Sequence, residues 1–101
     1  MDISLQFLDS KALMKISGAV TSEDVFELQD KLNEVLNSEI KKLDMDLSSC
    51  RSMCSSGIGK ILYFYKSFQE AGGEFEIVKS SPSIYELFTT IKLNQLFNIN
   101  L

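Results

Sequence analysis

The segment Ser55-Ser56-Gly57-Ile58-Gly59-Lys60 comes nearest, in residue types and spacing, to a motif that could do chemistry. A phosphate-binding P-loop requires G-x-x-x-x-G-K-[ST], whose glycines let backbone N–H groups surround the phosphates. Here Gly59-Lys60 is followed by Ile61, and Cys54 stands where the first glycine belongs. Because two defining positions fail, the segment does not predict a nucleotide site.

The paired serines Ser55 and Ser56 stand where an aperiodic segment gives way to apolar residues at helical spacing. Serine often caps a helix by accepting a hydrogen bond from its first N–H groups, and this needs no further function. A serine at a helix start can also be a phosphoacceptor, since free N–H groups and the positive end of the helix dipole tolerate an added phosphate. The residue types alone leave both interpretations open.

The chain lacks histidine and has two cysteines, Cys50 and Cys54. Ser-His and Cys-His nucleophile pairs are therefore excluded, and so is a four-ligand Cys/His zinc site within one chain. We expect both cysteines to be free thiols, because disulfides are rare in the cytosol, with Cys54 at a helix start that favours the thiolate. Neither an enzyme nor a cofactor is predicted.

Asp44 and Asp46 lie two apart on an expected strand, so their carboxylates point the same way. Calcium usually takes six or more oxygen ligands. Two carboxylates on a solvated strand face therefore predict surface charges, and no metal site is assigned.

Hydrophobic periodicity gives the elements that must position these residues. Alternation predicts strands at 3–7, 12–18, 43–47 and 74–77, and helical spacing predicts helices at 21–36, 55–70 and 81–91. Thr21 caps the first helix, Ser55 or Ser56 the second, and Ser81 precedes a proline at the first position of the third. Residues 48–54 are expected to form a loop, and the apolar tail after residue 95 has no definite type. The order β-β-α-β-α-β-α predicts an α/β fold, a mixed four- to five-stranded sheet with helices mainly on one face.

The helix stripes predict which side chains form the core. Tyr63 and Phe64 follow each other directly, so the sequence leaves open whether they pack inward or form an exposed patch. The side chains expected to be buried from the helices are Leu28, Leu32, Ile58, Leu62, Leu87 and Phe88, against Ile16, Met45, Leu47 and Ile77 from the strands.

Length and charge bound the class of protein. The 101 residues allow one domain, 1–101, with 45% apolar and 24% charged residues, an ordinary globular balance. A net charge of −4 without a basic cluster argues against nucleic-acid binding and against a basic membrane-surface patch. No apolar run approaches the roughly 20 residues of a membrane span, and Met1 to Ser4 show no signal-peptide pattern, so we expect a cytoplasmic protein.

Five short motifs stand out along the sequence, namely Asp46-Leu47-Ser48, Ser56-Gly57-Ile58-Gly59, Ile16-Ser17-Gly18, Gly72-Gly73 and Ser81-Pro82. Their order and spacing, over nearly the whole chain, resemble the STAS domain family, in particular its anti-sigma factor antagonists. That family has D-L-S at a strand end, a short loop, and then D-S-[SA]-G-[LI]-G opening a helix.

The resemblance implies a binding protein whose partner is an anti-sigma factor that is also a serine protein kinase. In the family the serine after the loop aspartate is phosphorylated, and that position is Ser55 here. The unphosphorylated antagonist captures its partner and frees a sigma factor, and phosphorylation releases the partner. The residues implied at the partner-binding site are Thr21, Cys54, Ser55, Ser56 and Gly57.

Two departures fall beside the implied acceptor. Cys54 replaces the aspartate before the serine, and Ala19 and Thr21 stand where acids are common before the first helix. Lys92 replaces a frequent glycine after the third helix, and the chain ends at Leu101, earlier than members with a full C-terminal helix. An alternative function is therefore kept: a STAS scaffold or accessory subunit that is not phosphorylated and stays in a stable regulatory or transport complex.

Overall fold

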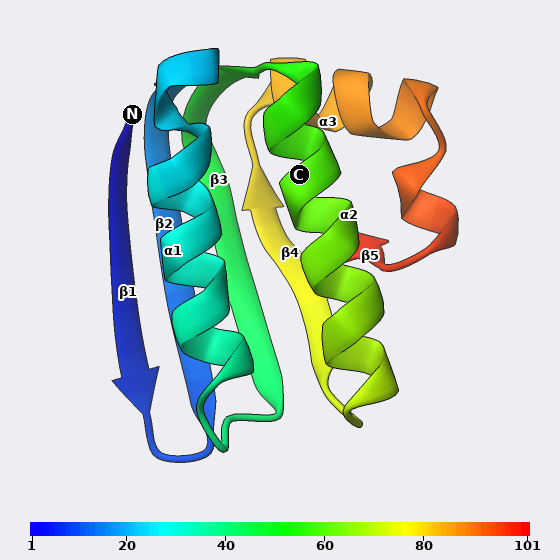
Figure 1. The fold of residues 1–101 in the computed structure, drawn as a ribbon. Helices are drawn as coiled ribbons and strands as arrows, with labels where there is room; N and C mark the ends of the chain where they lie inside the picture. Colours follow the sequence, from blue (N-terminus) through cyan, green and yellow to red (C-terminus); the bar gives the residue numbers. More distant parts are fainter.

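The computed structural model describes residues 1–101, which form five strands, three α-helices and two short 3-10 helices. Figure 1 shows them in chain order. The elements are β1 (Asp2–Leu8), β2 (Lys11–Val20), η1 (Ser22–Asp24), α1 (Val25–Leu36), β3 (Lys42–Met53), α2 (Ser55–Glu70), β4 (Glu74–Ser80), α3 (Pro82–Thr90), η2 (Leu93–Gln95) and β5 (Asn98–Ile99).

The strands form one mixed sheet in the order β1-β2-β3-β4-β5. β1 and β2 are an antiparallel hairpin, and the other neighbouring pairs are parallel. Helices α1 and α2 lie side by side across one face, and α3 lies near the upper ends of β3 and β4 (Figure 1). The predicted fold class is confirmed, and the sheet has five strands because a short β5 joins its edge.

The core lies between the helices and the apolar face of the sheet. Every second residue of the three central strands points into it, as the sequence alternation predicts. The buried strand residues of this layer are Ala12, Met14, Ile16, Leu43, Met45, Leu47, Phe75 and Ile77. From the helices, the expected Leu28, Leu32, Ile58 and Phe88 are buried as well. None of the helices combines the length and the apolar character that crossing a bilayer requires.

The second helix presents a different face to the sheet than expected. Leu62 is only half-buried, whereas Phe64 is 1% exposed and stacks on Phe68 with ring centroids 4.9 Å apart. Tyr63, its neighbour, is 71% exposed, so the two aromatic residues divide between core and surface. In α3, Leu87 is likewise half-buried rather than buried.

Three strands run at least two residues beyond the alternation, and one of them is β4, which ends at Ser80. β3 continues through the expected loop at 48–54 as far as Met53, and β2 continues past Gly18 to Val20. Register shifts near Ser17 and Gly18, where Gly18 has φ of +80°, let the two strands remain paired. Both strands therefore reach the same end of the sheet before the chain turns into a helix.

The C-terminal segment closes the other edge. Phe97 is buried and packs edge-on against Phe75 with centroids 4.8 Å apart, while Ile91 is 46% exposed and leaves the predicted face of α3. The Ser80 hydroxyl donates to the Asn100 carbonyl at 2.7 Å, and the Asn100 N–H donates to the Ile77 carbonyl at 2.9 Å. The tail is thereby fixed along β4.

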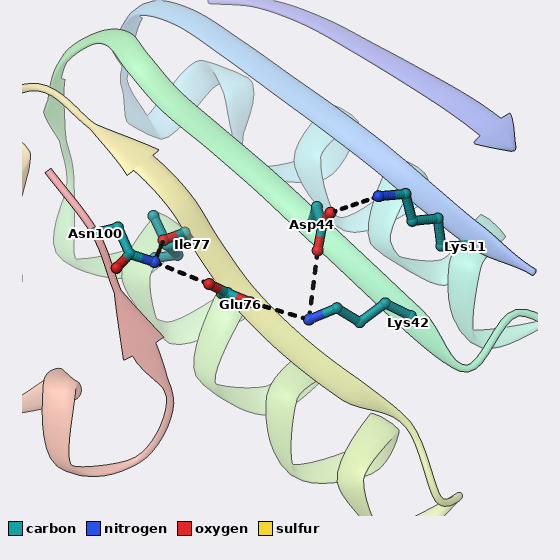
Figure 2. A network of polar contacts seen from close by, with 6 residues as sticks. All are labelled: Lys11, Lys42, Asp44, Glu76, Ile77 and Asn100. Atoms are coloured by element: carbon teal, nitrogen blue, oxygen red, sulfur yellow. Dashed lines mark hydrogen bonds and ion pairs between the residues drawn. The ribbon is translucent and has the colours of Figure 1, made fainter.

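The opposite face of the sheet carries no helix and holds a chain of charges (Figure 2). Asp44 lies 3.2 Å from the Lys11 ammonium and 3.4 Å from that of Lys42, which also contacts Glu76 at 3.2 Å. The Asn100 amide donates to Glu76 at 2.9 Å and so connects the network to the C-terminal segment. Burial disfavours the charged amine of Lys42, but the bond to Glu76 and the nearby carboxylates raise its pKa overall.

The other acid of the predicted pair, Asp46, accepts a hydrogen bond from the Ser48 N–H at 2.9 Å. Burial alone would raise the pKa of Asp46, but the hydrogen bonds from Ser48 and the charges of Lys15 and Lys79 outweigh it and lower that pKa. Asp44 is paired with a lysine and Asp46 accepts a hydrogen bond from the backbone, so both carboxylates belong to the polar face of the sheet.

Candidate functional site

The adjacent ends of β2 and β3 bring the predicted site residues together. Val20 and Met53, the last residues of these parallel strands, are register partners, and the Cys54 N–H donates to the Val20 carbonyl at 2.9 Å. Thr21 and Cys54 follow directly on the two strands and therefore leave the sheet side by side. The site lies on the ends of paired strands, and not on the loop that the sequence predicted.

Thr21 begins the first helical segment, as predicted, and its partner is Asp24. The Asp24 carboxylate accepts hydrogen bonds from the Thr21 N–H at 2.8 Å and from the Thr21 hydroxyl at 3.0 Å, and lies 3.9 Å from the Met1 amine. The backbone bond from Thr21 is the main reason why the pKa of Asp24 lies below its usual value. The sequence pattern does not indicate this contact.

The cap of α2 is Cys54, and the prediction that Ser55 or Ser56 caps this helix is wrong. Cys54 has the extended backbone of a cap residue, with φ of −71° and ψ of 160°, whereas Ser55 and Ser56 already lie within the helix. The Cys54 thiol lies 3.3 Å from the Ser56 hydroxyl. That hydrogen bond, with the N–H groups of the helix start, lowers the pKa of the Cys54 thiol.

The second cysteine has the opposite surroundings. Cys50 is fully buried, and burial raises the pKa of its thiol, which lies 3.4 Å from the Ser52 carbonyl. Both cysteines are free thiols in the structure. Of the two sulfurs, only that of Cys54 reaches the partly exposed rim of the site.

Exposure divides the remaining site residues. Thr21, Ser55 and Ser56 are exposed, whereas Gly57 is buried against the strand ends. A Cβ on Gly57 would lie 3.1 Å from the Met53 side chain and 3.2 Å from that of Val20. Gly57 therefore contributes by letting α2 approach the sheet closely, and the surface itself consists of the neighbouring residues.

The start of α2 is electrostatically suited to an added anion. The helix has 16 residues and no acidic residue in its first turn, so no carboxylate of that turn compensates its positive end. Ser55 occupies the first helical position, where backbone N–H groups have no intrahelical partner. A phosphate on Ser55 would lie beside those N–H groups without requiring the domain to refold.

A groove of about 520 Å³ runs between α1 and α2 and begins at Ser56. Its floor is apolar, and Tyr63, the exposed member of the aromatic pair, forms part of its wall. The sequence pattern does not predict the groove, although an exposed Tyr63 was one of the two placements that it left open. The residues that line it are Gln29, Leu32, Asn33, Leu36, Ser56, Gly59, Lys60, Tyr63 and Phe64.

Comparison with known proteins fits this architecture. The fold is a mixed five-stranded sheet with the start of a helix exposed at the ends of two parallel strands. The family model of the STAS domain matches residues 2–101, and the chain belongs to that family.

Solved structures share the fold at low sequence identity. An anti-sigma factor antagonist from Mycobacterium paratuberculosis superposes with a TM-score of 0.86 at 18% identity, over 99% of this chain and 86% of that chain. The anti-sigma factor antagonist SpoIIAA in its unphosphorylated form gives 0.78 at 14% identity, over 99% and 89%. The Bacillus cell fate determinant SpoIIAA in its phosphorylated form gives 0.79 at 15% identity, over 99% and 91%.

The contact between Asp24 and Thr21 makes a prediction about pH. Asp24→Asn should unfold at a lower urea concentration than the parent at pH 7, because the amide cannot replace the charge that the Thr21 N–H and the Met1 amine stabilise. The pKa of Asp24 is lower in the folded protein than in the unfolded chain. The stabilisation by the Asp24 carboxylate is therefore complete above the ordinary carboxyl pKa of about 3.9, and it is lost as the pH falls through the lower pKa of the folded protein.

Urea melts of both proteins between pH 7 and pH 2 measure this effect. The two midpoints should converge at the acid end, and Asp30→Asn, which changes an exposed acid of α1, should follow the parent throughout. A difference between Asp24→Asn and the parent that stayed constant down to the lowest pH would show that the carboxylate charge is not the cause.

Proposed function

We propose that this chain is an anti-sigma factor antagonist, which binds an anti-sigma factor that is also a serine protein kinase and releases it when Ser55 is phosphorylated. The observation that carries the proposal is the convergence of Thr21, Cys54, Ser55 and Ser56 at the exposed start of α2. Membership of the STAS family and the fold shared with anti-sigma factor antagonists support it.

The partner would cover the start of α2 and the adjoining groove between α1 and α2. The groove supplies an apolar contact through Tyr63 and Leu36, and its rim supplies polar groups through Lys60 and Asn33. Apolar area surrounded by polar groups is the usual composition of a specific protein interface. Ser55 would lie at the edge of this interface, where a bound kinase domain can reach its hydroxyl.

The chain leaves the phosphorylation chemistry to the partner. A serine hydroxyl is a weak nucleophile unless a base takes its proton, and this chain has no histidine and no acid in the first turn of α2. The kinase therefore supplies both the base and ATP. A phosphate brings about −1.5 to −2 charges into the interface, so release follows from local repulsion and steric block while the helix end accommodates the charge.

Isothermal titration against the anti-sigma kinase encoded beside the gene in the native host tests the switch. Ser55→Asp should bind at least about tenfold more weakly than the parent and keep its melting temperature, because the change is confined to the surface. Ser55→Ala should bind normally but gain no phosphate when incubated with the kinase and ATP. Ser56→Ala is the matched control, since it changes the neighbouring serine and should still gain one phosphate.

The alternative function predicts a different pattern. If the chain is a scaffold that is not phosphorylated, the parent and Ser55→Asp should bind the partner with the same affinity. The intact mass of the protein from its native host should then show no added phosphate. Cys54 in place of the family aspartate is the sequence feature that favours this alternative. Equal affinities would refute the switch.

A further inference from the structure

The free edge of the sheet at β1 lacks the features that usually protect an edge strand. β1 is the outermost strand, and nothing lies along its far side (Figure 1). Natural edges are blocked by prolines, lysines, bulges, short strands or a covering element. β1 has seven residues without proline, lysine or glycine, and it pairs with β2 through seven consecutive residues without a register shift. A full row of backbone groups is therefore open to another strand.

The sequence of β1 is complementary to itself when two copies run antiparallel. With Leu5 opposite Leu5 of a second copy, Ile3 faces Phe7 and Ser4 faces Gln6. Apolar residues then meet on the helix-bearing face, because side chains alternate along a strand. On the open face Ser4 meets Gln6 and Asp2 meets Leu8. We propose that β1 pairs antiparallel with β1 of a second copy of this chain, centred on Leu5, so that two sheets join into one.

Exposed apolar surface at this edge favours the same partner. Phe7 is 48% exposed and Leu8 41% exposed, although the other apolar residues of β1 pack against the core. In the paired arrangement Phe7 lies opposite Ile3 of the second copy, so the apolar layer of each sheet continues into the other. Cross-strand apolar pairs of this kind stabilise a ladder beyond its backbone hydrogen bonds.

No charge at the ends of the ladder opposes the pairing. Asp2 is the only charged residue of β1, and the arrangement places it opposite Leu8 of the second copy. Lys11 is the β2 partner of Leu8, so its backbone lies two strand spacings, about 10 Å, from that of Asp2 of the other copy. The two-fold symmetry repeats this arrangement at the other end, and no charges of the same sign lie directly opposite each other.

The dimer leaves the candidate functional site open. β2 and β3, whose ends lead to Thr21 and Cys54, lie inside the sheet and not at its edge. α2 covers the part of the sheet that lies away from β1 (Figure 1). The ladder has seven residues and is about 24 Å long, and each copy contributes a single strand. The area that it buries is therefore small compared with the usual area of about 800 Å² per partner. We therefore expect a reversible dimer that depends on concentration.

Sedimentation velocity of the full chain tests the proposal, in about 0.15 M salt and over concentrations up to roughly 1 mM. The parent should shift from monomer to dimer across this range. A parent that stays monomeric throughout would overturn the proposal and leave the edge to a strand from a different protein.

Two double variants test the register. Ser4 and Gln6 are exposed, and Ser4 pairs with Lys15 within the chain, so an acid at position 4 is compatible with the monomer. Ser4→Glu with Gln6→Glu places acids opposite each other twice across the two-fold axis and should weaken dimerisation by at least about fivefold. Ser4→Glu with Gln6→Lys places opposite charges at the same points and should dimerise at least as well as the parent.

The pair of variants distinguishes this interface from others. Both carry Ser4→Glu and differ only in the sign of the charge at position 6, and circular dichroism should show the same fold for both. If the two variants dimerise equally well, or are weakened equally, the copies do not meet along β1 in this register and the proposal is wrong.

Discussion

Phe64→Ala is expected to lower the free energy of unfolding by about 3–5 kcal/mol, which is a large part of the stability of a domain this small. Phe64 is 1% exposed and stacks on Phe68 at 4.9 Å, with the Phe75 ring edge-on at 5.7 Å. Removing the ring leaves a cavity that α2 and β4 cannot close, because Phe68 and Phe75 are themselves held in the core.

Leu62→Ala is the matched comparison, since it truncates a large apolar residue two positions away in the same helix. Leu62 is only half-buried, so the variant should lose less than half of what Phe64→Ala loses. Urea denaturation followed by circular dichroism measures both free energies. A larger loss for Leu62→Ala would mean that α2 presents the Leu62 side to the sheet, as its sequence suggested.

The face of α2 could not be chosen from the sequence because two apolar stripes overlap there. One stripe contains Leu62 and Tyr65, and the other contains Gly57 and Phe64, while both share Ile61 and Phe68. Gly57 decides between them in the structure, since its missing side chain lets the helix start lie against Met53 and Val20. That contact is tertiary, and helical periodicity carries no information about it.

The ends of β2 and β3 were missed for a similar reason. Residues 48–53 do not alternate between apolar and polar, and register shifts interrupt the pairing near Ser17 and Gly18. These residues are strand because β2 and β3 pair with each other, as the pairs Gly18–Cys50 and Val20–Met53 show. Sequence alternation reports which face is buried, and it does not report a ladder formed at an irregular register.

The resemblance to the STAS family singled out Thr21, Cys54 and Ser55 as candidate site residues, but it did not give their geometry. The structure places all three at the adjoining ends of β2 and β3. The residue that caps α2 is Cys54 and not a serine. Capping depends on which residue has extended backbone angles, and here that residue is Cys54. Residue type predicts that a helix begins, with an uncertainty of one or two positions.

Gly73→Ala is expected to destabilise the protein by about 1–3 kcal/mol, even though the backbone at Gly73 suits any residue. A Cβ at this position would lie 2.6 Å from the ring of Phe68, a distance at which one of the two must move. Phe68 is 2% exposed and stacks on Phe64, and the Gly73 N–H donates to the Phe68 carbonyl at 2.7 Å, so neither can yield easily. The sequence motifs include Gly72-Gly73 but do not indicate this contact; in the structure Gly72, with φ of +86°, follows the end of α2.

Gly59→Ala is the control for this substitution, because it adds the same methyl group where the structure has room. Gly59 lies inside α2 and is exposed, and a Cβ there would meet no atom within 4 Å. Alanine in a helix interior should therefore raise stability by about 0.5–1 kcal/mol. Thermal and urea melts of the two variants should move in opposite directions from the parent. If Gly73→Ala were as stable as Gly59→Ala, the close contact between the end of α2 and β4 would not limit the packing of this core.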